Sequence, residues 1–153
     1  MNRIREILLP EHILLDLKAT SREEAVAAVA DSLHGDPRII DWPRFLNSLN
    51  ECEHSGKINL ALGLTLSHNR TRCVNSMVMA FGRMAEPIPC DPSAIRFIVI
   101  IGIPETMDAD YLRLVGGLMR VFRDHELRQR LEKGEAPRDI LDAFEQGEKK
   151  LGS

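Results

Sequence analysis

Cysteine is scarce in this chain, and its three thiols, Cys52, Cys73 and Cys90, lie far apart in a sequence of 153 residues. Their number is odd and no C-x-x-C pair is present, so reduced thiols are a better interpretation than a disulfide framework. Their spacing to the neighbouring histidines matches no compact zinc signature. We therefore expect neither a metal site nor a cofactor.

Long hydrophobic runs and an excess of one charge are also missing. The longest strongly apolar stretch, Phe97 to Ile103, is far short of the ~20 residues that a membrane-spanning helix requires. Residues 1–15 show no secretory signal pattern. The 20 Lys and Arg residues and the 23 Asp and Glu residues are interspersed and give a net charge of -3. We expect a soluble cytoplasmic protein that neither binds nucleic acid nor inserts into a membrane.

Repeats, low-complexity segments and Gly/Ser linkers are absent as well, so residues 1–153 are predicted to form a single domain. Ser21 followed by Glu24 is a capping box that predicts a helix start. The other predicted elements are an extended segment at 7–17, a helix from 41 to about 50–56, strands at 60–66, 76–82 and 95–103, and helices from 108, 124 and 136. Helices thus flank a central group of strands, which indicates an α/β fold.

One histidine stands apart from the other four. The other four are His12, His34, His54 and His125. Their surroundings are typical of strand, loop or helix-end positions, and no chemistry is assigned to them. His68 directly follows the apolar run at 60–66, where a buried strand is expected to reach the surface, and α/β proteins build sites at such strand ends. Position alone favours an ordinary loop histidine.

The residues around His68 form a longer pattern. In order along the chain, this pattern consists of Glu53, Gly56, residues 63–68, Pro87-Ile88 and Asp91. This pattern resembles the R-E-x-x-G-S-T-G-I-G-x-G-I-A-I-P-H segment of enzyme IIA domains of the bacterial sugar phosphotransferase system, of the fructose, mannitol and nitrogen-regulatory type. The resemblance extends over nearly the whole chain, including the segments at 17–25 and 112–114 and the apolar strand ending at Pro104.

The resemblance implies a central mixed sheet, of five strands or similar, with helices on both faces. It also implies phosphoryl transfer to His68 from a small histidine-phosphorylated carrier protein (HPr-like), and a regulatory role through a downstream protein, because freestanding members are often regulatory. The chemistry suits the residue, since a neutral imidazole with an unperturbed pKa of about 6.5 is a nitrogen nucleophile near pH 7.

Several positions depart from the family pattern. The replacements are Cys52 for the motif arginine, Lys57 and Ile58 for Ser-Thr, Asn59 and Ala61 for two glycines, Ser67 for the proline, and Tyr111 for a second histidine. The candidates for holding phosphate are Arg70, Lys57, Ser67 and Tyr111, whereas Arg72 is interpreted as a solvated charge. Tyr111 can orient His68 through a hydrogen bond, but packing on the helix face is the preferred interpretation. Two hypotheses follow: a working phosphoryl carrier, or a regulatory module that acts by protein contact without phosphorylation.

Overall fold

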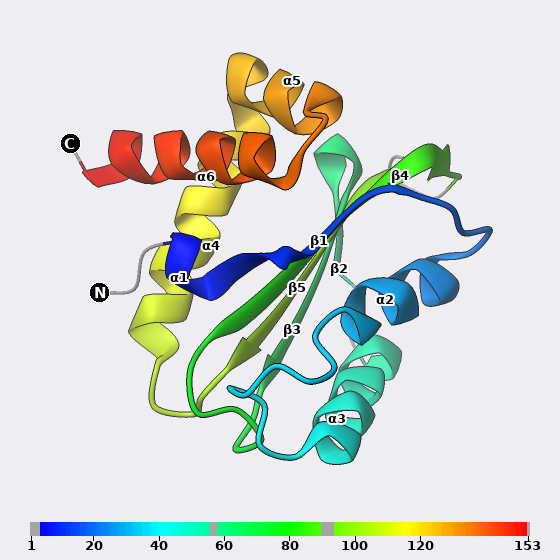
Figure 1. Cartoon of the computed structure of the whole chain (residues 1–153), viewed down its shortest axis with the longest axis vertical. Coiled ribbons are helices and arrows are strands. Elements are labelled where there is room, and N and C mark those ends of the chain that lie inside the picture. Colours follow the sequence, from blue (N-terminus) through cyan, green and yellow to red (C-terminus); the bar gives the residue numbers. More distant parts are fainter. Residues whose placement is uncertain (1–3, 56–57, 90–93, 153) are drawn as a thin grey trace.

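The computed structural model describes residues 4–55, 58–89 and 94–152, and its centre is a five-stranded sheet in the spatial order β1-β4-β5-β3-β2 (Figure 1). The strands are β1 (Leu8–Leu17), β2 (Ile58–Leu60), β3 (Leu64–Arg70), β4 (Val78–Ile88) and β5 (Ile95–Ile103). β1 is parallel to β4 and β3 is parallel to β5, whereas the β4–β5 and β2–β3 pairs are antiparallel. The mixed sheet implied by the sequence is confirmed.

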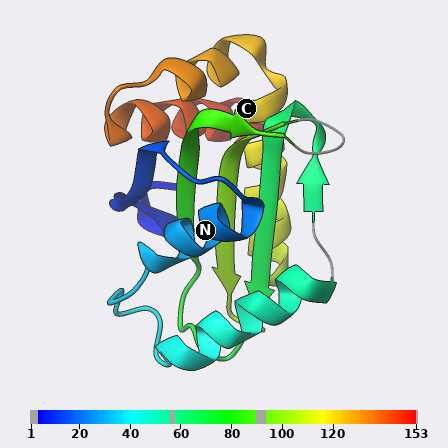
Figure 2. The same ribbon diagram turned by 90° about the vertical axis from the view of Figure 1, so that its right-hand side faces the viewer.

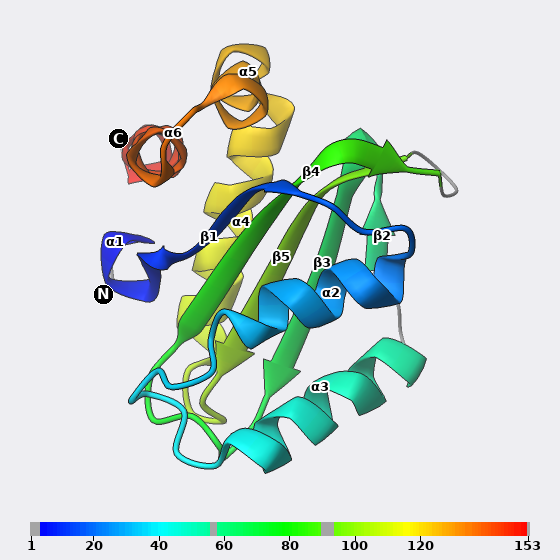
Figure 3. The same cartoon turned by 45° about the vertical axis from the view of Figure 1, so that its right-hand side comes forward.

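Helices cover both faces of this sheet, as Figure 3 shows. They are α1 (Ile4–Ile7), α2 (Arg22–Asp31), α3 (Trp42–Ser55), α4 (Asp108–Arg123), α5 (His125–Lys133) and α6 (Pro137–Gly152). α2 and α3 lie on one face, and α1, α4, α5 and α6 lie on the other. The α/β class with helices on both faces is therefore confirmed.

Strand β5 separates two hydrophobic cores. Its alternate residues Phe97, Val99 and Ile101 pack toward α4, α5 and α6, whereas Ile98 and Ile100 pack toward α2 and α3. All five are fully buried. A continuous apolar run is typical of a strand that is buried on both faces, and the strand predicted at 95–103 has these bounds in the structure.

The capping signals locate the helix starts well. The Ser21 hydroxyl accepts a hydrogen bond from the Glu24 backbone N–H at 3.1 Å, and the Asp124 carboxylate accepts one from Leu127 N–H at 3.1 Å. A complete capping box would also have the Glu24 carboxylate accept from the Ser21 backbone N–H. The carboxylate instead accepts hydrogen bonds from the backbone N–H and the hydroxyl of Thr20, at 3.2 and 2.9 Å. The predicted starts of α2 and α5 are confirmed.

The strand predicted at 60–66 is wrong in its bounds, because the chain reverses direction inside it. β2 ends at Leu60, a short 3-10 turn occupies Ala61–Gly63, and β3 then runs back antiparallel to β2 (Figure 2). Leu62 and Gly63 both have positive φ, at 75° and 73°. A bulky residue rarely adopts this conformation, so an apolar leucine concealed the turn.

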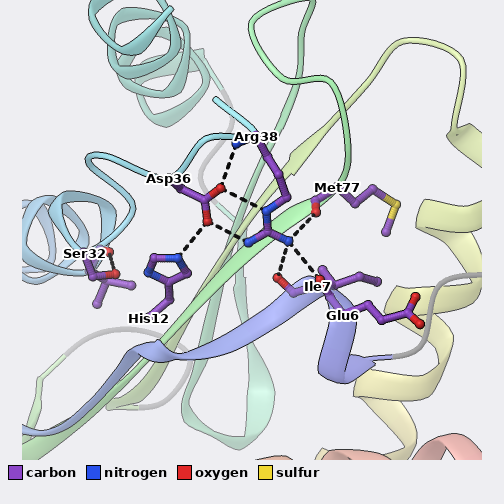
Figure 4. A network of polar contacts seen from close by, with 8 residues as sticks. Glu6, Ile7, His12, Ser32, Asp36, Arg38 and Met77 are labelled. Carbon is purple, nitrogen blue, oxygen red and sulfur yellow. Dashed lines mark hydrogen bonds and ion pairs between the residues drawn. The ribbon is translucent and has the colours of Figure 1, made fainter. Parts of the chain in front are cut away.

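A buried polar network ties β1 to the loop before α3 (Figure 4). The Asp36 carboxylate lies 2.8 Å from Nε2 of His12 and accepts hydrogen bonds from Nε and Nη2 of Arg38 at 3.0 and 2.7 Å. Arg38 Nη1 also donates to the backbone oxygens of Glu6, Ile7 and Met77. His12 lies in a strand, as predicted, but the sequence did not predict that its ring is buried against a carboxylate from a distant part of the chain.

The pKa of Asp36 reflects two opposed effects. Burial raises the pKa of this carboxyl, but the hydrogen bonds from Arg38 and His12 outweigh burial and hold the pKa well below its usual range. Asp36 is therefore ionised near neutral pH, and its buried carboxylate forms an ion pair with the partly buried Arg38 guanidinium.

Gly82 of β4 provides a test of how tightly α2 packs on the sheet. A Cβ atom at Gly82 would lie 2.5 Å from Val29 Cγ2 of α2, so Gly82→Ala is expected to destabilise the fold by about 1–3 kcal/mol through overpacking. Gly117 in α4 is the matched control, because a Cβ there meets nothing within 4 Å. Gly117→Ala should be neutral or stabilising by up to about 1 kcal/mol. Urea unfolding of both variants measures this, and equal effects would contradict the predicted contact.

Candidate functional site

His68 lies inside β3, opposite Ile101 of the neighbouring strand β5. The prediction that it follows the end of a strand is therefore wrong, because β3 continues to Arg70. Side chains alternate along a strand, and Leu64 and Leu66 pack into the core under α4, so His68 faces the same layer. Its side chain is half-buried.

The ring of Tyr111 packs against the ring of His68. The two ring centroids are 5.4 Å apart with an interplanar angle of 33°. Tyr111 lies in the first turn of α4, and its partial burial raises the pKa of its hydroxyl. The hydroxyl thus stays protonated near pH 7 and can donate a hydrogen bond. This ring contact is compatible with both roles that the sequence suggested for Tyr111, packing and orientation of the His68 ring.

The two nitrogens of the His68 ring have different environments. Nδ1 is buried and has no hydrogen-bond partner among the residues that the structure describes. A nitrogen closed off in this way cannot be reached by a second protein. Nε2 is not among the buried side-chain atoms of the described residues that lack a hydrogen-bond partner.

Arg70 lies two residues after His68 on the same face of β3, but its guanidinium is engaged with the start of α4. Nε contacts Asp108 Oδ1 at 2.9 Å, and Nη2 donates to the Glu105 backbone oxygen at 3.0 Å. The Arg70 and Asp108 side chains are 55% and 61% exposed, so their ion pair is weak and its partners can exchange. Arg72 is more exposed still and pairs with the Glu105 carboxylate.

A comparison with protein families matches residues 6–147 to the family described as the phosphoenolpyruvate-dependent sugar phosphotransferase system, EIIA 2. This chain belongs to that enzyme IIA family. The match covers the sheet, the helices on both faces and the segment around His68, and the predicted resemblance is confirmed.

Two curated relatives differ in how much of their own length this chain covers. The chain is 27% identical over 138 residues to the 2-O-alpha-mannosyl-D-glycerate-specific EIIABC component of Escherichia coli, and it spans 87% of its own length but only 21% of that protein. It is 25% identical over 134 residues to a nitrogen regulatory protein of Bradyrhizobium diazoefficiens, covering 84% of this chain and 85% of the relative.

Solved enzyme IIA structures share the fold. The nitrogen regulatory protein IIA-Ntr of Neisseria meningitidis superposes with a TM-score of 0.82 at 23% identity, covering 92% of this chain and 98% of that one. The mannitol enzyme IIA of Escherichia coli, solved in complex with phosphorylated enzyme IIB, gives a TM-score of 0.72 at 16% identity over 88% and 94% of the two chains. That mannitol domain thus docks against a phosphorylated partner protein.

Ser67, at the position of the motif proline, lies on the opposite face of β3 from His68. Alternation along β3 turns Ser67 toward α2 and α3, on the face where the Asn69 amide donates to the Phe45 backbone oxygen of α3. The Ser67 side chain therefore does not lie beside the His68 ring. Lys57 lies outside the described residues, and so does the side chain of Cys52.

Two further features are absent from the part of the chain that the structure describes. No group of three or more His, Cys, Asp or Glu side chains at 4–51, 62–89 and 94–149 is arranged to hold a metal ion. Nor is any helix among the described residues both long and apolar enough to cross a membrane.

Proposed function

We propose that Nε2 of His68 accepts a phosphoryl group from a histidine-phosphorylated, HPr-like carrier protein and passes it on in a regulatory phosphotransferase pathway in the cytoplasm. The single observation that supports this most is the half-buried His68 ring, whose Nδ1 is buried without a partner among the described residues whereas Nε2 is not. Membership of the enzyme IIA family supplies the reaction class. The nitrogen regulatory relative favours a regulatory role.

The transfer step requires a free lone pair on Nε2, so the proton of the neutral ring sits on Nδ1 before the reaction. The P–N bond of the carrier phosphohistidine breaks as the bond from phosphorus to Nε2 of His68 forms, and the carrier imidazole leaves with the electron pair. Such a transfer asks the protein mainly for in-line positioning and for donors to the phosphoryl oxygens.

Two residues are proposed as those donors. The Tyr111 hydroxyl is protonated and its ring lies against His68, so it positions the ring and donates to a phosphoryl oxygen. Arg70 exchanges its exposed partner Asp108 for the phosphoryl group, because the solvated ion pair is weak and a guanidinium can form paired hydrogen bonds to phosphoryl oxygens. Ser67 is not included, since its side chain belongs to the other face of the sheet.

The experiment is incubation of the full chain with phosphoenolpyruvate, enzyme I and the carrier protein, followed by intact-mass measurement. We expect the mass of one phosphoryl group to be added, and the modification to be labile in acid as phosphohistidine is. Omitting the carrier protein is the control and should leave the mass unchanged. A chain that stays unmodified in the complete mixture would overturn the proposal.

The alternative is a regulatory module that acts by contact without phosphorylation. It is favoured by Cys52 at the motif arginine position and by the engagement of Arg70 with Asp108. Pull-down of partner proteins separates the two functions. Under the alternative, unphosphorylated protein and His68→Ala capture the same partners with equal efficiency, whereas the carrier proposal expects capture to depend on phosphorylation.

Leu112 is expected to form part of the contact with the carrier protein. It directly follows Tyr111 in α4, and 68% of it is exposed, which is unusual for a large apolar side chain. Burial of a leucine contributes about 1.5–3 kcal/mol, so Leu112→Glu should weaken carrier binding by about 10-fold or more. Ile40→Glu is the matched control, because Ile40 is 63% exposed but lies in the loop before α3. Calorimetric titration in which both variants bind equally would contradict this role.

A further inference from the structure

An open surface cavity lies at the other end of the sheet from His68. It is about 490 Å³ in volume and is lined by the 3-10 turn before β3, the end of β4, the start of β5 and helix α5. Figure 1 shows α5 close to the turn that joins β2 and β3. Cavities of about 300–1,000 Å³ are the usual size for small-molecule sites.

The cavity is separate from the phosphoryl site. Arg96, on its wall, precedes Ile101 by five residues in β5, and Ile101 is the register partner of His68. At about 3.3 Å per residue, the cavity lies roughly 16 Å from the His68 position along the strand. A ligand in this cavity would therefore not touch the His68 ring.

Three charged side chains converge on this cavity: Arg96, Arg128 and Glu132. Nε of Arg96 pairs with Glu132 Oε2 at 2.9 Å, and Nη1 of Arg96 donates to the Ala85 backbone oxygen at 3.2 Å. These contacts fix the Arg96 guanidinium in place. Among the described residues, its Nη2 has no acceptor and remains available to a ligand.

Among the described residues, the Arg128 guanidinium is hydrogen-bonded through one of its three nitrogens. Its Nη2 donates to the Leu62 backbone oxygen at 3.0 Å, and its Nε and Nη1 have no acceptor in the described part of the chain. Among the lining residues that the structure describes, two guanidiniums and one carboxylate give an excess of one positive charge. Arginine offers paired donors that match the oxygens of a carboxylate or phosphate group.

The backbone beside these arginines is strained and closely packed. Leu62 has φ 75°, which is an outlier for a bulky residue, and its carbonyl is the one that Arg128 bonds. A Cβ at Gly63 would lie 3.0 Å from the Ala94 backbone oxygen and 3.3 Å from Cβ of Arg96. Conformations of this kind persist where the surroundings enforce them, and they concentrate at ligand sites.

From the cavity, its two partly unsatisfied arginines and its strained, closely packed turn, we propose that this end of the protein binds a small organic anion through a carboxylate or phosphate group. Arg96 and Arg128 bond the oxygens of the anion, and Glu132 holds Arg96 in position. The apolar part of the lining and the limited volume suit a metabolite and not a polyanion. Binding of the anion at this site is independent of the proposed phosphoryl transfer.

The test uses the full chain with two probes, inorganic phosphate and succinate, which separate phosphate ligands from carboxylate ligands. Each is titrated while the backbone amide of Gly63 is followed by NMR, against sodium chloride at equal ionic strength. We expect at least one probe to shift this amide in a saturable manner, and the probe that does so assigns the class of anion. Shifts no larger than those in sodium chloride, with both probes, would overturn the proposal.

Four variants locate the binding. Arg128→Gln should weaken it at least 10-fold, and Ala94→Leu should block the cavity while both arginines remain. Arg130→Gln, on the same helix but paired with Glu126 outside the cavity, should bind as the wild type does. His68→Ala should also bind normally, which makes this test independent of the phosphoryl proposal. Binding that survives Ala94→Leu, or that is lost in His68→Ala, would place the anion elsewhere and refute the inference.

Discussion

Replacing His68 by alanine is expected to eliminate phosphoryl uptake, from about one group per chain to none, because covalent transfer needs a nucleophile and alanine has none. The fold should tolerate the change. The ring is half-buried, and its buried Nδ1 has no partner among the described residues, so no hydrogen bond to them is lost through that nitrogen. Intact-mass measurement after incubation with phosphoenolpyruvate, enzyme I and carrier protein gives the stoichiometry.

His125→Ala is the matched control for this experiment. His125 is an exposed histidine at the start of α5, and no element brings it next to Tyr111. His125→Ala should leave the number of phosphoryl groups per chain unchanged. Phosphoryl uptake that persists in His68→Ala and disappears in His125→Ala would show that the acceptor is a different histidine.

Replacing Asp36 by asparagine is expected to lower the free energy of unfolding by about 3 kcal/mol, because it leaves the Arg38 charge inside the protein without its carboxylate. The same change removes the acceptor for His12. Asp142→Asn is the matched control: Asp142 also pairs with an arginine, Arg5, but its side chain is 57% exposed. Loss of an exposed pair has a small effect. Urea unfolding that gave equal losses for the two variants would contradict the structural role of the network.

The Asp36 contribution should also depend on pH. Because the pKa of this carboxyl is lower in the folded protein than in the unfolded chain, its stabilisation is present above the unfolded pKa of about 4. It is lost as the pH falls below that value toward the folded pKa. The difference in unfolding free energy between wild type and Asp36→Asn should therefore be constant from neutral pH to about pH 5 and shrink in more acidic buffers. A difference that grows on acidification would contradict the ion pair.

Local signals in the sequence predicted most of the fold. The capping residues Ser21 and Asp124 and the β-branched run at 95–103 each depend on neighbours in the chain, and the structure has α2, α5 and β5 where those residues indicate them. The reversal of the chain at Leu62 was missed because an apolar leucine does not predict a positive φ. His68 was placed after the strand for a different reason: the apolar run ends at Leu66, whereas β3 continues through polar residues to Arg70.

Contacts between distant segments could not be predicted in the same way. His12 and Asp36 are 24 residues apart, and only the folded chain brings the loop before α3 onto β1. The pairing of Arg70 with Asp108 depends likewise on how α4 docks beside β3. The opposite orientation of Ser67 follows from strand alternation, but only once the bounds of β3 are known.

The central claim, that Nε2 of His68 carries the phosphoryl group, is tested most directly by long-range proton–nitrogen correlation spectra of the phosphorylated protein. With nitrogen-labelled histidine and assignment through His68→Ala, the spectra identify both the residue and the ring atom. We predict phosphorus coupling at Nε2 of His68 alone. Coupling at Nδ1 of His68, coupling at another histidine, or no coupling in protein exposed to the complete donor system would contradict this account.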